Sequence, residues 1–193
     1  MPLEAVAKVQ FDRSACVDRK SLEHFFPPGA LFPGERAAEL HEFLRSWYSR
    51  ILSRMEGPSL SCGSSDIETY RFLMIPTWGQ PTAVRVVFRA DGAVLTADRL
   101  SGQGGYDPGR LETSVRRVLF RTERELLRRE VMRAGFWRML VRDPDHFGVD
   151  GTQWILEGRF ADRYHVVDRW SPRTGQFHEL GALFARLGGV PLR

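Results

Sequence analysis

The sequence predicts an α+β fold in which a mostly antiparallel sheet of five or six strands packs against three helices. The predicted strands come in two groups separated by a helix, without the regular strand–helix alternation that is typical of parallel sheets. Segments of strand character alternate apolar and polar residues, whereas three other segments repeat apolar residues every three or four positions.

The composition is that of a soluble globular protein, with 193 residues of which 42% are hydrophobic and 27% are charged. This length is sufficient for a core without disulfides, and Cys16 and Cys62 form no Cys-x-x-Cys pair. The N-terminus has no signal-peptide pattern, and no apolar run approaches the ~18 residues that would span a bilayer. We therefore expect a cytoplasmic protein without a membrane anchor.

Residues 1–58 are predicted to form an irregular arm and one amphipathic helix, folded as one unit with an α+β domain of residues 66–193. The arm ends in Phe25-Phe26-Pro27-Pro28-Gly29 and is expected to pack through its aromatics. The helix is expected from about Glu35 to Met55, and Gly57-Pro58 ends it. Its apolar stripe consists of Leu40, Phe43, Leu44, Trp47, Tyr48, Ile51, Leu52 and Met55.

The first group of predicted strands is a meander with one apolar face. Asp91-Gly92 predicts a tight turn within it, and residues 101–109 predict a loop. The expected strands are Tyr70–Thr77, Thr82–Arg89, Ala93–Leu100 and Leu111–Phe120.

After the meander, the sequence predicts a helix, a hairpin and a last helix. Thr122 and Glu125 predict a capping box that opens a helix ending before Gly135. The hairpin strands are expected at Thr152–Gly158 and Tyr164–Trp170, and the last helix runs from about Gly175 to Leu187.

The hairpin Asp150–Pro172 carries the densest polar chemistry of the chain. If Gly158 lies opposite Tyr164, one side of the sheet presents a candidate binding face made of Gln153, Glu157, His165 and Arg169. This face is either a polar pocket or a solvated surface with cross-strand Glu–His and Gln–Arg pairs. The solvated surface is favoured because antiparallel sheets commonly keep one face in water. A slip of one residue would reverse the partition.

Four hairpin residues are predicted to be structural anchors: Asp150, Trp154, Asp168 and Trp170. In the same register Asp168 lies among Trp154, Val166 and Trp170, where an unpaired carboxylate is costly. We expect it to accept hydrogen bonds from Arg169, an indole N–H or the amides of the following turn. An anchor is favoured over a catalytic acid.

The segment from Arg110 to Arg142 contains ten Arg and four Glu, a balance of +6 in a chain of net charge +4. A basic face is expected from Arg121, Arg124 and Arg128 on one helix. No aromatic residues interleave there for base stacking, so a solvated face is favoured over nucleic-acid binding. A basic patch for an acidic protein is the intermediate alternative.

No catalytic residues, cofactor or metal site are assigned. Asp143, Asp145 and Gly148 match the first, third and sixth positions of a calcium loop, but Phe147 and Trp154 stand where ligands are needed. The histidines lack zinc spacing, and the glycine-rich loop lacks a Gly-Lys-Ser/Thr ending.

The segment Asp150-Gly151-x-x-Trp154-x-Leu156-Glu157-Gly158, followed by Tyr164-His165-Val166-Val167-Asp168-Arg169-Trp170-Ser171-Pro172, resembles the signature of an uncharacterised bacterial protein family. Gly104-Gly105-Tyr106-Asp107 and Gly135-Phe136-Trp137 fit the same pattern. The resemblance covers about residues 70–187 and implies a hairpin–helix–hairpin domain without an assigned activity.

These observations favour a non-enzymatic binding module that neutralises or escorts another bacterial protein, in the manner of an immunity protein. The alternative is a small enzyme or ligand-binding protein that uses Glu157, His165, Asp168 and Arg169, and the third is Arg-mediated nucleic-acid binding. A deep pocket lined by the hairpin residues would favour the enzyme.

Overall fold

The structure, a computed structural model, describes residues 25–31, 38–55, 57–61, 67–143, 148 and 150–192. Within these ranges the chain forms three α-helices, one short 3-10 helix and six strands. In chain order they are α1 (Ala38–Leu52), β1 (Thr69–Pro76), β2 (Thr82–Arg89), β3 (Gly92–Leu100), β4 (Leu111–Val118), α2 (Arg121–Arg133), η3 (Phe136–Arg138), β5 (Thr152–Phe160), β6 (Arg163–Trp170) and α3 (Gly175–Gly188).

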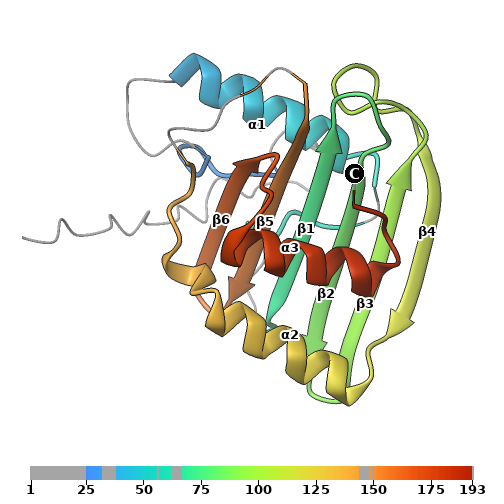
Figure 1. The fold of residues 1–193 in the computed structure, drawn as a ribbon, viewed down its shortest axis with the longest axis vertical. Helices are drawn as coiled ribbons and strands as arrows, with labels where there is room; N and C mark the ends of the chain where they lie inside the picture. Colours follow the sequence, from blue (N-terminus) through green and yellow to red (C-terminus); the bar gives the residue numbers. More distant parts are fainter. Residues whose placement is uncertain are drawn as a thin grey trace, which may run out of the picture.

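All six strands belong to one antiparallel sheet with the order β4-β3-β2-β1-β5-β6. The meander β1–β4 runs toward one edge, and β5 then pairs with the other side of β1, so that β6 forms the second edge (Figure 1). The predicted α+β fold class is confirmed.

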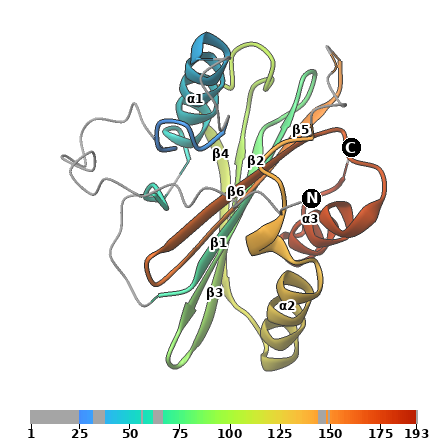
Figure 2. The same ribbon diagram turned by 90° about the vertical axis from the view of Figure 1, so that its left-hand side faces the viewer.

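The helices divide between the two faces of the sheet. Figure 2 shows α1 on one face and α2 with α3 on the other. Tyr48 and Ile51 of α1 pack with Leu73, Ile75 and Ile155, together with Phe25 and Phe26 of the N-terminal segment. On the opposite face, the predicted apolar row of β2 packs against α2 and α3. Both faces of the central strands are therefore covered, and every residue of β1 is buried.

The predicted capping box of Thr122 and Glu125 is wrong, because the helix begins two residues earlier than expected. Helix α2 begins at Arg121, and the carboxylate of Glu123, rather than that of Glu125, accepts the backbone N–H of Phe120 at 2.8 Å. The expected end is confirmed: Gly135 follows the helix with φ of 63°, a left-handed conformation that favours glycine.

Helix α3 approaches the hairpin closely at Gly181. A Cβ atom there would lie 2.7 Å from two ring atoms of Trp154 and 3.0 Å from Phe72. The absent side chain thus allows the helix to lie directly on the aromatic rings, and this contact holds β5 against α3.

Candidate functional site

The β5–β6 hairpin pairs in a register that differs by one residue from the predicted one. Gly158 lies opposite His165, and Glu157 lies opposite Val166. Phe160 pairs with Arg163, so the connection is the two-residue turn Ala161–Asp162. The expected pairs Glu157–His165 and Gln153–Arg169 are therefore wrong, because Gln153 lies opposite Trp170 in this register.

The candidate binding face is divided between the two sides of the sheet as a result. Gln153 and Glu157 share the α1 side with Ile155 and Val166, which belong to the core beneath α1. His165 and Arg169 share the other side with Val167 and the α3 core. Gln153 and Glu157 are also buried, so the alternative of a solvated face is wrong as well.

Glu157 is fully buried in an ion pair with Arg71 of β1, at 2.5 Å from Nη2 and 2.8 Å from Nε. The hydroxyl of Tyr164 donates a further hydrogen bond of 2.8 Å to the same carboxylate. Burial raises the pKa of Glu157, while Arg71 acts in the opposite direction. This carboxylate is committed to the fold and does not reach the surface.

Asp168 is buried, as expected, but its partners differ from the predicted ones. Its carboxylate accepts hydrogen bonds from the Tyr48 hydroxyl at 3.2 Å and from the Gln153 amide, and Arg142 Nη1 lies 3.6 Å away. Trp154 lies on the opposite face of the sheet. Burial raises the pKa of Asp168, and Arg142 opposes that rise. Asp168 thus connects α1, β5 and the segment before β5.

His165 and Arg169 fasten the segment that follows η3. His165 Nε2 lies 3.0 Å from the carbonyl oxygen of Met139, and Arg169 donates to the carbonyls of Leu140 and Val141 at 2.7 and 2.9 Å. Burial lowers the pKa of His165. Both side chains that were predicted to bind a partner instead satisfy backbone carbonyls of the protein itself.

The other predicted anchors have different surroundings. Trp154 is buried and stacks on His178, with ring centroids 5.5 Å apart. Asp150 is exposed and accepts a hydrogen bond of 3.1 Å from the indole of Trp78. Trp170 is half-buried and contributes to a surface cleft.

The predicted basic face carries internal ion pairs. Arg121 pairs with Glu125 at 2.7 Å, and Arg128 pairs with Glu68 at 2.7 Å while covering the ring of Phe88. Arg124 lies on the same helix between them. Two of the three arginines of the predicted basic face therefore already have carboxylate partners.

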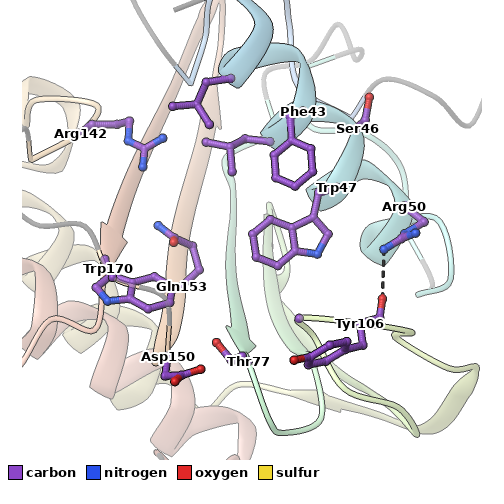
Figure 3. A pocket seen from close by; sticks show the side chains of 14 residues that line it. Phe43, Ser46, Trp47, Arg50, Thr77, Tyr106, Arg142, Asp150, Gln153 and Trp170 are labelled. Atoms are coloured by element: carbon purple, nitrogen blue, oxygen red, sulfur yellow. Dashed lines mark hydrogen bonds between the residues drawn. The ribbon is translucent and has the colours of Figure 1, made fainter.

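The structure also forms a cleft of about 760 Å³ that the sequence did not predict. It lies between α1, the loops after β1 and β3, and the open end of the β5–β6 hairpin (Figure 3). Its lining consists of Leu40, Phe43, Leu44, Ser46, Trp47, Arg50, Thr77, Gly105, Tyr106, Arg142, Gly148, Asp150, Gln153 and Trp170.

Aromatic side chains form the walls of this cleft. In Figure 3 the indoles of Trp47 and Trp170 lie on opposite sides, with the Gln153 amide between them. Trp47 is fixed by a hydrogen bond of 2.9 Å from its indole to the Gly104 carbonyl. Tyr106 is exposed and packs on Trp78, with ring centroids 5.0 Å apart.

The width of the apolar stripe on α1 was the available sequence signal for the cleft. Leu44, Tyr48, Ile51 and Leu52 are buried, whereas Phe43 is 63% exposed at the cleft rim. The apolar stripe of α1 is therefore wider than the face that the helix buries, and it contains both core residues and surface residues. The partners of this surface come from distant loops, so spacing along α1 alone did not indicate a cleft.

Among the described residues, no three His, Cys, Asp or Glu side chains are grouped to hold a metal ion. Most of the calcium-like loop, as well as Cys16 and Cys62, lies outside the described residues. No helix in the described part of the chain is long and apolar enough to cross a bilayer.

Comparisons with known proteins do not identify the chain. No model of a protein family matches the sequence, and the search of curated proteins found no match. The resemblance inferred from the hairpin stays a prediction.

Proposed function

We propose that this chain is a non-enzymatic bacterial protein of the cytoplasm, and that its cleft receives an apolar or aromatic side chain of a partner protein that it neutralises or escorts. The observation that carries the proposal is the aromatic cleft between α1 and the hairpin. Exposed aromatic residues around a concave surface are typical of the centres of protein interfaces.

The polar groups of the cleft support binding over catalysis. Arg50 donates to the Tyr106 carbonyl at 3.1 Å, Asp150 accepts from Trp78, and the Gln153 amide donates to Asp168. Among the described residues, the titratable side chains of the lining are Arg50, Tyr106, Arg142 and Asp150. This set contains neither a nucleophile paired with a base nor a general acid–base pair.

The enzyme alternative receives no support from the hairpin geometry. Glu157 is enclosed by Arg71 and Tyr164, and His165 lies on the other side of the sheet. A catalytic group must reach a substrate within hydrogen-bond distance, and these two groups do not share a solvent-accessible space.

The proposal is tested by capture of partners from the native host with a tagged Phe43→Ser variant. The matched control is Met132→Ser on α2, because Met132 is 73% exposed and Phe43 is 63% exposed. We expect wild type and Met132→Ser to retain the same stoichiometric protein, and Phe43→Ser to retain at least about tenfold less of it. Circular dichroism checks that both variants keep the fold.

Equal retention by the two variants would contradict the proposal, as would the absence of a stoichiometric partner of wild type. A small molecule that copurifies with wild type but not with Phe43→Ser would favour the ligand-binding alternative instead.

A further inference from the structure

The two edges of the sheet are not equivalent. Along β6, the backbone N–H of Asp168 donates to the Val141 carbonyl at 2.7 Å, and Arg142 bridges to Asp168, so this edge is partly covered. Strand β4 is the opposite edge, and Figure 1 shows no other described strand or helix on its outer side. An open strand edge is a template for pairing with another strand.

The outward hydrogen-bonding groups of β4 follow from its pairing with β3. Leu119 N–H donates to the Ala93 carbonyl at 2.8 Å, so these two residues form a hydrogen-bonded pair. Because such pairs alternate along antiparallel strands, Val115 and Arg117 also bond toward β3. Ser114 and Arg116 therefore direct their N–H and C=O groups away from the sheet.

Two apolar side chains of β4 are unusually exposed for residues in a sheet. Val115 is 56% exposed and Val118 is 68% exposed. The charges of the strand are separated along its length, with Glu112 near the start and Arg116 and Arg117 near the end. Antiparallel pairing of the strand with itself brings the acidic end of one copy to the basic end of the other.

We propose that β4 pairs antiparallel with β4 of a second copy of this chain, about a two-fold axis at Val115. Ser114 of each copy lies opposite Arg116 of the other and exchanges backbone hydrogen bonds with it. Val115 meets Val115 of the second copy in a non-hydrogen-bonded pair, where side chains are closest. The sheets of the two copies then form one continuous sheet.

The two-fold axis and the charges restrict the register. An axis perpendicular to the sheet keeps equivalent faces together, so a residue pairs only with one on its own face. A register centred on Arg116 would oppose two like charges. The register centred on Val115 instead places Arg117, which keeps its own ion pair with Glu123, opposite the uncharged Thr113 of the other copy.

Disulfide trapping tests both the contact and its register, in full-length protein in which Cys16 and Cys62 are replaced by Ser. Val115→Cys should form a covalent dimer on oxidation, because the paired Cα atoms would lie about 4.5 Å apart, within disulfide range. Thr113→Cys is the matched control on the same face. Its two Cα atoms would be about 13 Å apart, and it should stay monomeric on a non-reducing gel.

Charges introduced at Val115 provide an independent test, in which analytical ultracentrifugation measures the self-association. Val115→Glu and Val115→Lys should each weaken self-association by at least about tenfold, and an equimolar mixture of the two should form a heterodimer. Wild-type protein that is monomeric across the micromolar range would overturn the proposal. Equal cross-linking of Val115→Cys and Thr113→Cys would also overturn it.

Discussion

Tyr48 of α1 donates a hydrogen bond of 3.2 Å to the carboxylate of Asp168 in β6. Both side chains are buried, and the same carboxylate accepts a hydrogen bond from Gln153 at the floor of the cleft. The contact therefore connects the helix that forms one wall of the cleft to the hairpin that forms the other.

We expect Tyr48→Phe and Asp168→Asn each to lower the free energy of unfolding by about 1–3 kcal/mol. The first variant removes a hydroxyl donor from a buried carboxylate. The second removes the negative charge that lies 3.6 Å from Arg142. Urea unfolding followed by circular dichroism measures both losses.

The double variant shows whether the two residues act together. Its loss should be smaller than the sum of the single losses, by about 1 kcal/mol, because Tyr48→Phe removes the charge-assisted hydrogen bond that Asp168→Asn already weakens. Strictly additive losses would show that Tyr48 and Asp168 are not coupled.

The buried pair Arg71–Glu157 gives a second prediction. Glu157→Gln should lower the free energy of unfolding by about 3–5 kcal/mol, because Arg71 would keep a buried charge without its counter-ion. Glu125→Gln is the control, since its partner Arg121 is exposed and water screens that pair. Thermal melts of both variants give the comparison, and equal melting temperatures would contradict it.

His41 should make the stability of the protein depend on pH. Its Nε2 accepts the N–H of Gly29 at 2.8 Å, which requires a neutral ring. Burial lowers the pKa of His41, Arg45 acts in the same direction, and Glu42 opposes them. The unfolded chain, with a His pKa of about 6.5, then binds more protons than the native protein just below that pH.

The contribution of His41 to stability is therefore complete above pH ~6.5 and is lost as the pH falls toward its lowered native pKa. His165, whose pKa burial also lowers, contributes in the same direction. We expect His41→Gln to reduce the loss of stability between about pH 7.5 and 5.5 without abolishing it. Urea midpoints across that range that change identically in variant and wild type would contradict this prediction.

Local sequence patterns were sufficient to predict most of the elements. The alternation of Val84, Val86 and Phe88 placed a strand over the same residues as β2, and Gly135 marked the end of α2. These features depend on neighbours within one turn or one strand, where backbone geometry fixes which side chains share a face. The α+β class followed from the order of the elements.

The hairpin register had no comparable sequence signal. Ala161 adopts a φ of 51° in the turn, a conformation that favours glycine or asparagine, and the turn contains neither of them. Packing on both faces of the sheet selects this register, because it buries Ile155 and Val166 beneath α1 and Leu156 and Val167 on the opposite face.

The sequence by itself determined the strands, the helices and the concentration of polar groups in the hairpin. Only the tertiary structure decided that Glu157 and Asp168 are enclosed and that Phe43, Trp47 and Trp170 surround a cleft. The spacing of apolar residues along the chain indicates which side chains share one face of a helix or strand. Whether that face is covered depends on segments as far apart as Tyr48 and Asp168, which meet only when the sheet has formed.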